Sequence, residues 1–368
     1  MKKVLMIASE ASHFKNFHVP YIEYLKEHGM EVYTASNGVF SGSDTICTEH
    51  TELGFRKKLF HFGNIGVMLK LSRLIRASGI DTVCTNSTLA GFVGRAAVVL
   101  SLKRSVRTVH ICHGYLFSDD SSLRSRVYLF FEKLVRKRTD LLAVMNEEDL
   151  AIAQKYRLGK RIVFINGMGV PPERFPRISR EDAEKMRASL KKEGEDTLFL
   201  CVGEFSERKN QREIIEAFSR LPANTINKCR LVLAGEGQLA GYCRELARSL
   251  GVDGKVAFLG HFDDMNLLYR SCDCLISASR FEGLPFNVME ALYCGEDIIV
   301  SDVKGNRDLC VGGAGSSYPY GNVEKLSELM RRRAESAGTR VCRLEDKYLS
   351  PGAVPENLGK LYGADLQR

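Results

Sequence analysis

The chain lacks any long uninterrupted run of apolar residues. Its longest runs, such as residues 96–100, fall far short of the roughly 18 residues that a membrane-spanning helix needs. The opening Met1-Lys2-Lys3 leads directly into the apolar segment 4–8, which is too short for the apolar region of a secretion signal. We therefore expect no membrane span and no secretion signal, and we expect a cytoplasmic protein.

The cysteines lack any paired or metal-binding arrangement. There are eleven of them, scattered along the chain, and no two have the C-x2-C spacing. An odd number of scattered cysteines is typical of reduced thiols in a reducing compartment and argues against a disulfide framework or a zinc site.

The chain also lacks the G-x-G-x-x-G pattern of dinucleotide-binding enzymes. Its first apolar segment leads into Ser9-Glu10-Ala11, and the later pair Gly235 and Gly237 has no third glycine at the required offset. A nicotinamide-dependent enzyme is therefore disfavoured.

Short apolar strands alternate with amphipathic helices along both halves of the chain, which predicts parallel sheets covered by helices on both faces. In the first half, a helix is expected at 19–28, and strands are expected at 3–8, 31–35, 82–85, 106–112, 141–145 and 162–165. In the second half, a charged helix is expected at 180–192, and strands are expected at 198–202, 231–234, 256–259, 274–277 and 298–300. The predicted fold class is α/β, with two doubly wound, Rossmann-like domains.

The two domains are expected to meet at a cluster of prolines. The chain has 368 residues, more than one core usually serves, and residues 171–176 interrupt the alternation with three prolines. We place the first domain at 1–175 and the second at 176–352. Pro351 and Pro355 precede a last helix, about 353–368, which we expect to pack back on the first domain.

Residues 277–301 contain the most informative pattern in the sequence. Glu282 and Glu290 stand eight apart, and Gly283-Leu284-Pro285 between them suits a turn from a strand into a helix. Helix N-termini bind anions, and carboxylates beside them accept hydrogen bonds from sugar hydroxyls. A sugar joined to a diphosphate would satisfy both kinds of group, whereas two solvated acids at an ordinary helix start are the simpler alternative.

This stretch resembles the E-x7-E signature of the retaining glycosyltransferases of family 4, which have the GT-B fold, two Rossmann-like domains facing each other across a cleft. The later segment Gly305-Asn306-Arg307-Asp308-Leu309 resembles the members that build bacterial capsular and extracellular polysaccharides. The resemblance implies an acceptor-binding first domain and a donor-binding second domain. It also implies that Glu282 holds hydroxyls of the donor sugar and Glu290 holds the ribose, with a donor site that includes Gly283, Leu284, Pro285, Phe286 and Asn287.

A second segment matches the family less completely. The family commonly places an arginine and a lysine five apart after the first strand of the second domain, where they neutralise the donor diphosphate. The lysine falls on Lys209, but the arginine position holds Glu204, so Arg208 or the loop's N–H groups would supply the second charge. A solvated basic pair at a helix start is the alternative.

Two further resemblances lie in the first domain. The segment ending in His113-Gly114 resembles the family's His-Gly element beside the transferred sugar, which gives His113 a catalytic role. In a strand, His110 and His113 point to opposite faces and could not share a metal ion. Residues 12–21 resemble the polysaccharide members, and His13 and Asn16 would line the cleft; Gly114 is a further candidate there.

Charge is concentrated in the first half. Residues 1–176 hold 25 Lys and Arg against 16 Asp and Glu, although the whole chain has a net charge of only +8. This surplus favours an anionic partner such as a membrane surface, although it could serve solubility alone. Within 121–138, apolar residues recur at helical spacing among basic ones, which fits either a core-facing helix or a membrane-surface helix.

The sequence as a whole favours a hexosyl-type glycosyltransferase. It would move a sugar from a nucleotide diphosphate, with UDP-sugar as the expected donor, onto a polyprenyl-diphosphate-linked saccharide with retention of configuration. No metal or other cofactor and no nucleic acid is expected, and the enzyme would lie peripherally on the inner face of the cytoplasmic membrane. A sugar-nucleotide epimerase and an inactive binding subunit are the alternatives; Glu204 and Glu296-Asp297, where the family usually has Leu-Pro, support the latter.

Overall fold

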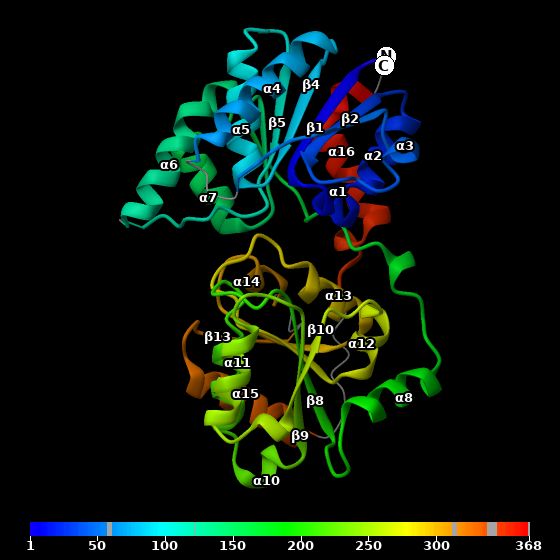
Figure 1. Cartoon of the computed structure of the whole chain (residues 1–368), viewed down its shortest axis with the longest axis vertical. Helices are drawn as coiled ribbons and strands as arrows, with labels where there is room; N and C mark the ends of the chain where they lie inside the picture. Colours follow the sequence, from blue (N-terminus) through cyan, green and yellow to red (C-terminus); the bar gives the residue numbers. More distant parts are fainter. Residues whose placement is uncertain (57–60, 121, 311–314, 337–343, 367–368) are drawn as a thin grey trace. The chain divides into compact units, whose positions relative to one another are not determined.

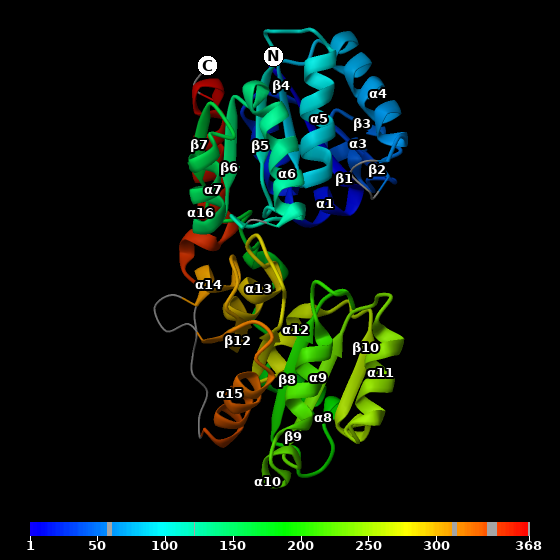
Figure 2. The same ribbon diagram turned by 90° about the vertical axis from the view of Figure 1, so that its left-hand side faces the viewer.

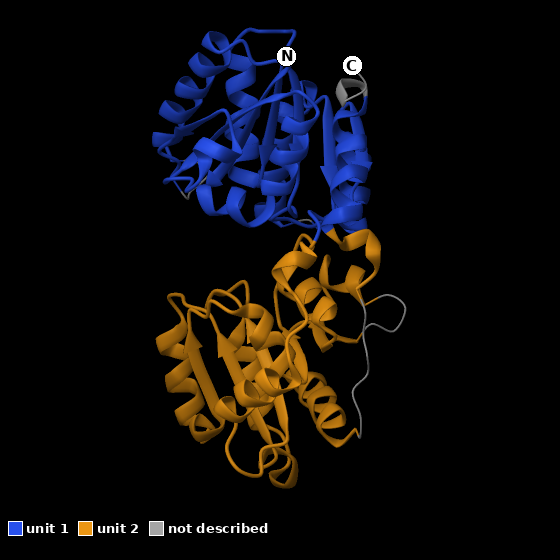
Figure 3. Ribbon diagram, turned by 90° about the vertical axis from the view of Figure 1, so that its right-hand side faces the viewer, with its two compact units in different colours: residues 1–169, 350–368 blue, residues 170–349 orange. Residues whose placement is uncertain are grey.

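The computed structural model describes residues 1–56, 61–120, 122–310, 315–336 and 344–366, and it forms two compact units (Figure 1). Unit 1 comprises Met1–Gly169 with Ser350–Arg368, and unit 2 comprises Val170–Leu349 (Figure 3). The division falls six residues before the predicted position at 175/176, ahead of the proline cluster.

Unit 1 contains an all-parallel sheet of seven strands in the order β3-β2-β1-β4-β5-β6-β7. The strands are β1 (Lys3–Glu10), β2 (Glu31–Asn37), β3 (Glu49–Glu52), β4 (Thr82–Asn86), β5 (Arg107–Ile111), β6 (Leu141–Val144) and β7 (Arg161–Phe164). The helices are α1 (Ala11–Phe17), α2 (Val19–Glu27), α3 (Ser43–Ile46), α4 (Gly63–Ala77), α5 (Thr88–Leu100), α6 (Leu123–Val135), α7 (Glu147–Tyr156) and α16 (Ser350–Leu366), with the 3-10 turn η1 (Arg136–Arg138).

Unit 2 contains a parallel sheet of six strands in the order β10-β9-β8-β11-β12-β13. The strands are β8 (Thr197–Val202), β9 (Cys229–Ala234), β10 (Val256–Gly260), β11 (Cys274–Ser277), β12 (Asp297–Ser301) and β13 (Ser316–Tyr318). The helices are α8 (Arg180–Leu190), α9 (Gln211–Ser219), α10 (Ala223–Ile226), α11 (Ala240–Ser249), α12 (Met265–Ser271), α13 (Phe286–Cys294), α14 (Asn306–Leu309) and α15 (Val323–Glu335), with the 3-10 turns η2 (Pro172–Arg174), η3 (Asp253–Lys255) and η5 (Asp346–Tyr348).

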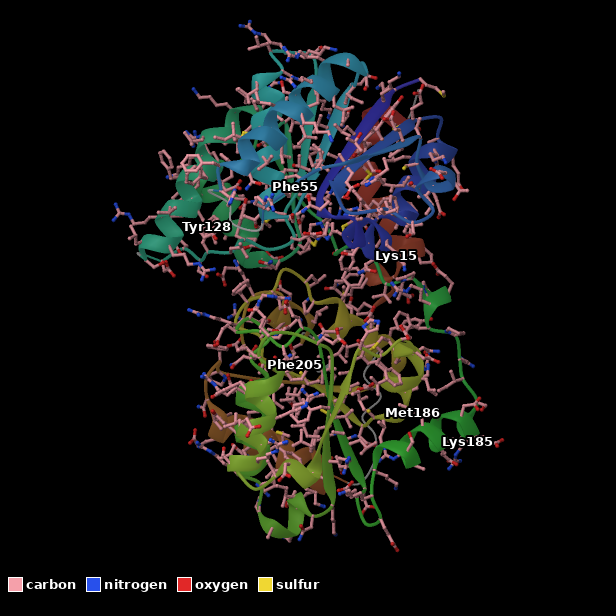
Figure 4. All side chains as sticks on the ribbon, viewed as in Figure 1. Lys15, Phe55, Tyr128, Lys185, Met186 and Phe205 are labelled. Atoms are coloured by element: carbon pink, nitrogen blue, oxygen red, sulfur yellow. The ribbon has the colours of Figure 1, made fainter. Side chains whose placement is uncertain are left out.

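The predicted α/β class with two doubly wound parallel sheets is confirmed. In each unit the chain reverses its direction across the sheet, between β1 and β4 and between β8 and β11. Right-handed crossovers then place helices on opposite faces. Buried residues of β8, β9 and α9 form the core of unit 2, which includes Phe205, labelled in Figure 4. Loops at the carboxyl ends of the strands around each reversal are where such sheets bind ligands.

The sequence analysis missed two edge strands. β3 has the sequence EHTE with no buried residue, and β13 has only three residues. Each of these strands pairs with only one neighbouring strand, at the edge of its sheet. Because such strands are less buried than central ones, neither shows the continuous apolar run by which buried parallel strands are recognised.

The C-terminal helix packs on unit 1, beside β7 (Figure 2). Asn357 Nδ2 donates to the main-chain oxygen of Gly167 and to the Tyr21 hydroxyl, each at 2.7 Å, and Arg107 donates to the oxygen of Leu361 at 2.6 Å. The prediction that Pro351 and Pro355 precede this helix was wrong, because α16 begins at Ser350 and contains both prolines. Burial of its apolar face on unit 1 offsets the lost main-chain hydrogen bond.

Helix α6 does not have the simple core-facing arrangement that its spacing suggested. Leu123, Phe130 and Leu134 are 75%, 55% and 56% exposed, whereas the charged Glu132 is buried. Spacings of seven and four residues put the three exposed apolar side chains on one face of the helix. In the part of the chain that the structure describes, no helix is long and apolar enough to cross a membrane.

Glu132 of α6 is buried because it pairs with Arg95 of α5. The Arg95 guanidinium donates to both carboxylate oxygens of Glu132, at 2.8 and 2.9 Å, and its Nε donates to the oxygen of Gly91 at 2.8 Å. Arg95 is fully buried, so water cannot replace this pair. The ion pair therefore fixes α6 against α5.

We expect Glu132→Leu alone to lower the free energy of unfolding by about 3–5 kcal/mol, because it leaves a buried, unpaired guanidinium. The double variant Arg95→Met/Glu132→Leu should recover most of this loss, because it removes both charges. Urea denaturation followed by circular dichroism measures both effects. A single variant as stable as the wild type would show that the pair does not hold α6.

Candidate active site

The predicted donor residues lie at the carboxyl ends of β8 and β11, the neighbouring strands at the reversal of unit 2. Arg208 and Lys209 follow β8, and Glu282 follows β11. The two loops also touch through their main chains, since the N–H of Arg280 donates to the oxygen of Arg208 at 2.8 Å. The fold therefore brings together residues more than seventy positions apart.

Glu282 is bound by both cations. Lys209 Nζ lies 2.7 Å from one of its carboxylate oxygens, and Arg208 Nη1 lies 2.7 Å from the other. Burial opposes ionisation of Glu282, but Lys209 and Arg208 outweigh burial and hold the pKa of its carboxyl below the ordinary value. The site thus contains an ionised, nearly buried carboxylate beside two positive charges. We call these three residues the ion triad.

Glycines let the loops around the ion triad approach closely. Gly305, with φ +79°, lies so near the loop after β11 that a Cβ atom would come within 2.5 Å of the oxygen of Gly283. Gly235 lies similarly near Gly203, where the distance would be 2.1 Å. Any side chain at these positions would push apart the loops that hold Glu282 and Lys209.

Helix α13 begins directly after the ion triad. Pro285 is its N-cap, Phe286 is its first residue, and Leu284 is buried just before it. Asn287 Nδ2 donates to the main-chain oxygen of Val202 at 3.0 Å, which ties the first turn of α13 to the end of β8. The helix N-terminus is therefore held beside the loop that carries Lys209, where its N–H groups favour an anion.

Glu290 lies one turn further along α13, in a different environment. It accepts a hydrogen bond from the Tyr269 hydroxyl at 3.0 Å. Burial raises the pKa of its carboxyl to about 7, although Tyr269 and the more distant Arg174 act in the opposite direction. The two acids of the motif thus differ in protonation near neutral pH.

Glu204, the departure from the family pattern, stands apart from the ion triad. Its side chain is exposed, and its main-chain oxygen accepts from Gln211 Nε2 at 3.0 Å. Arg208, rather than residue 204, supplies the second positive charge beside Lys209.

In unit 1, His113 follows β5 and meets His13 of α1. Their Nε2 atoms lie 3.3 Å apart, and Asn86 Oδ1 lies 3.5 Å from Nε2 of His113. His18, between α1 and α2, completes the group: one nitrogen from each ring lies within 4.8 Å of the others. Burial lowers the pKa of His13 to about 4 and also lowers that of His113, to which the nearby His13 contributes. We call these residues the histidine cluster.

The sequence analysis missed His18, although H-x4-H within residues 13–18 was a usable signal. His110 has a structural place instead, hydrogen-bonded to the Thr85 hydroxyl and main-chain oxygen at 3.0 and 3.1 Å. Gly91 leaves room for its ring, because a Cβ there would lie 2.4 Å from it.

The other two predicted residues of unit 1 lie near the histidine cluster. Asn16 is exposed on α1. Gly114, with φ +106°, lines a pocket of about 380 Å³ together with Ser9, Ser87 and His113. The pocket lies where the strand order of unit 1 reverses, which suits a bound ligand.

Comparison with known proteins places both halves of the chain among sugar-transferring enzymes. Residues 28–166 match the family described as "Glycosyl transferase 4-like domain", and residues 182–341 match "Glycosyl transferases group 1". EpsD of Bacillus subtilis (strain 168), provisionally described as a glycosyltransferase, is 30% identical over 85% of this chain and 82% of its own length.

A second relative and two solved structures extend this likeness. The Escherichia coli enzyme "UDP-Gal:alpha-D-GlcNAc-diphosphoundecaprenol alpha-1,3-galactosyltransferase" is 27% identical over 66% of this chain and 63% of its own length. The structure of HepE from Anabaena in complex with UDP matches with a TM-score of 0.71 and 16% identity, covering 98% and 95% of the two chains. A glycosyltransferase from Rickettsia africae matches with a TM-score of 0.73 and 16% identity over 98% of each chain.

Glu296 and Asp297, the second departure from the family pattern, are buried at the start of β12. Asp297 pairs with Arg333 at 3.2 Å. Both carboxylate oxygens of Glu296 are buried without a hydrogen-bond partner among the residues that the structure describes. Burial, with a contribution from Asp273, raises the pKa of Glu296 well above its ordinary value. This acid belongs to the core beneath α13, not to the ion triad.

We expect Glu296→Gln to stabilise the protein increasingly as the pH rises. A carboxyl whose pKa is raised by folding stabilises the folded state at low pH, and this stability is lost as the pH rises through the raised value. Melting temperatures measured from pH 5 to 9 should therefore fall more steeply for the wild type than for Glu296→Gln. Parallel curves for the two proteins would contradict the raised pKa.

Proposed function

Because this chain belongs to the family 4 glycosyltransferases of the GT-B fold, we propose that it transfers a sugar from a UDP-sugar to a polyprenyl-diphosphate-linked saccharide with retention of anomeric configuration. The observation that carries the proposal is the ion triad at the start of α13. The name of the Escherichia coli relative, which specifies a UDP-sugar and a diphosphoundecaprenol acceptor, supports this choice of substrates.

The ion triad suits the departure of a nucleoside diphosphate. Negative charge develops on the leaving diphosphate during transfer, and preorganised cations stabilise such charge most effectively in a partly buried site. Lys209 is 11% exposed, and Asn287 holds the first turn of α13 against the end of β8, from which the loop with Lys209 continues. Because these groups supply the positive charge, the transfer itself requires no metal ion in this proposal.

Glu282 then has two parts in the proposed mechanism. Its ionised oxygens accept hydrogen bonds from hydroxyls of the donor sugar, and its charge holds Lys209 and Arg208 in place before the donor arrives. Glu290 accepts from the ribose, and His113 contacts the transferred sugar. The attacking hydroxyl of the acceptor loses its proton to the departing phosphate oxygen, and no side-chain nucleophile is involved.

The ion triad predicts opposite effects of two substitutions on UDP binding. Lys209→Ala should weaken binding by roughly 1.5–3 kcal/mol, because it removes a charge-assisted hydrogen bond. Glu282→Gln should tighten binding of UDP alone, because both cations then lack a competing carboxylate. Calorimetry measures both, with Glu204→Gln as a control that removes a nearby exposed charge.

Unchanged UDP affinity in Lys209→Ala would show that Lys209 does not bind the diphosphate. Weaker UDP binding in Glu282→Gln would mean that this carboxylate assists diphosphate binding and does not compete with it.

The transfer reaction is tested with UDP-sugars and a polyprenyl-diphosphate-linked saccharide, with NMR of the anomeric proton to read the configuration. Glu282→Gln should mainly lower kcat, because its contacts change as the sugar reorganises, whereas Glu290→Gln should mainly raise the donor KM.

The donor KM of the wild type should also fall as the pH rises through about 7. The Glu290 carboxyl then loses its proton and can only accept hydrogen bonds, as its proposed contact with the ribose requires. This pH dependence should be absent in Glu290→Gln.

The same assay separates the alternatives. A sugar-nucleotide epimerase would convert the donor without an acceptor, and an inactive subunit would bind UDP and turn nothing over. Reversed kinetic effects of the two glutamate variants would mean that their roles are exchanged.

We further propose that unit 1 docks on an anionic membrane surface through α6. The exposed apolar face formed by Leu123, Phe130 and Leu134 is accompanied by the exposed basic residues Arg124, Arg126, Lys133 and Lys137. Figure 4 labels Tyr128 on this helix. An apolar stripe among basic side chains is the pattern of a helix lying in the membrane interface. A site for a polyprenyl-linked acceptor would then face the cytoplasmic leaflet.

Two variants test the membrane contact. Phe130→Ser/Leu134→Ser removes apolar contact, and Arg126→Gln/Lys133→Gln removes charge, so each should weaken sedimentation with anionic liposomes while leaving UDP affinity intact. These positions are preferable to Arg136 and Arg138, which take part in the fold. Arg136 donates to the main-chain oxygen of Tyr156, and Arg138 donates to the main-chain oxygens of Lys103 and Val106.

Binding of the wild type should fall steeply from low to high salt, because each basic residue near the surface contributes about 1 kcal/mol that salt screens. Val39→Ser, at an exposed apolar position elsewhere in unit 1, serves as the control. Absence of liposome binding at low salt would remove the membrane from the proposal and favour a soluble acceptor.

A further inference from the structure

The histidine cluster of unit 1 has the geometry of an unassigned metal site. We propose that His13, His18 and His113 bind a divalent transition-metal ion of the zinc class. The proposal goes beyond the transfer reaction, in which the ion triad of unit 2 supplies the positive charge. The sequence argued against a metal ion shared by His110 and His113. The site proposed here is a different one, because the partners of His113 are His13 and His18.

The distances fit a tetrahedral ion. Zinc–nitrogen bonds of about 2.0–2.1 Å place two ligand nitrogens of a tetrahedron about 3.3–3.4 Å apart. The Nε2 atoms of His13 and His113 are 3.3 Å apart, and the nearest nitrogen of His18 lies within 4.8 Å of them. The third nitrogen, on His18, would have to move closer to the other two to reach bonding distance.

His18 provides an independent reason for a ligand. Its side chain is fully buried, and neither ring nitrogen has a hydrogen-bond partner among the residues that the structure describes. A buried polar group without a partner is unfavourable, and such groups in native proteins commonly mark an ion or water site. A hydrogen bond between His13 and His113 would account for those two rings alone and would leave His18 unsatisfied.

The three rings come from separate elements that the core holds in place. His13 lies on α1, His18 joins α1 to α2, and His113 follows β5. The His18 ring packs edge-on against Phe14 and Tyr21, at 5.9 and 6.0 Å between ring centres, and both of these aromatic residues are buried. The site is therefore partly preorganised.

The donor set selects the class of metal. Three imidazoles without a carboxylate suit zinc, cobalt, nickel or copper and not magnesium or calcium, which prefer oxygen ligands. Burial keeps the rings neutral, the form that binds metal. His113 also lines the 380 Å³ pocket, which offers the ion a route of entry and a fourth ligand such as water. The ion would fix His113 relative to α1.

The experiment uses the full chain after dialysis against a chelator. Titration with Co²⁺ should give the intense visible absorption of a four-coordinate ion with one equivalent bound, and Zn²⁺ should displace it. His13→Gln and His18→Gln should each weaken Zn²⁺ binding at least tenfold, about 1.4 kcal/mol. His28→Gln, which replaces an exposed histidine of the same unit, should leave the affinity unchanged.

Circular dichroism checks that the variants fold. The half-buried His13 keeps the test decisive if replacement of the buried His18 unfolds the protein. Absence of Co²⁺ binding, a weak six-coordinate spectrum, or an affinity that His13→Gln does not change would overturn the proposal. The variants leave His113, which has a role in the proposed transfer, unchanged, and UDP binding is tested separately by the ion triad of unit 2.

Discussion

The proposed chemistry of this enzyme depends on one electrostatic arrangement, a nearly buried carboxylate held between a lysine and an arginine. Ionised Glu282 would be costly in this position without partners, and unpaired Lys209 would be costly in turn. Pairing removes both costs and joins the loop after β11 to the loop after β8. A diphosphate that enters this site exchanges one negative partner for another, so the cations need little rearrangement to receive it.

This arrangement explains why the surrounding loops are rich in glycine. The cations and the carboxylate can meet only if main chain lies directly against main chain at Gly305 and Gly283, and again at Gly235 and Gly203. Gly305 belongs to the segment whose resemblance pointed to polysaccharide-building members of the family. Its physical part is to let the loop after β12 support the loop that carries Glu282.

Much of the fold was predictable from the sequence, because buried parallel strands are continuous apolar runs that leave a clear signal. The strand from 274 to 277 was predicted to the residue, whereas edge strand β3 was missed because none of its side chains is fully buried. The spacing in helix α6 left two interpretations open for a related reason. Apolar spacing shows that a helix has an apolar face but not what that face meets, and here the buried partner of Arg95 is Glu132.

The positions of the predicted site residues in the fold followed from the sequence, but their electrostatic states did not. Motif spacing placed Glu282 in a turn and Glu290 on the following helix, as the structure has them. Spacing could not show that Lys209 and Arg208 pair with Glu282, or that His18 joins His13 and His113, because these contacts depend on how distant loops meet.

The contrast among three nearby acids shows how such contacts set the charge of each acid. Glu282, Glu290 and Glu296 are all largely buried, and burial alone would raise the pKa of each. Two cations reverse that effect at Glu282, and the Tyr269 hydroxyl and Arg174 moderate it at Glu290. At Glu296 no group among the described residues offsets it. Only Glu282 is therefore held firmly as an anion. A permanent negative charge is what organises cations for an incoming diphosphate, whereas an acid that titrates near neutrality suits a neutral hydroxyl such as that of a ribose.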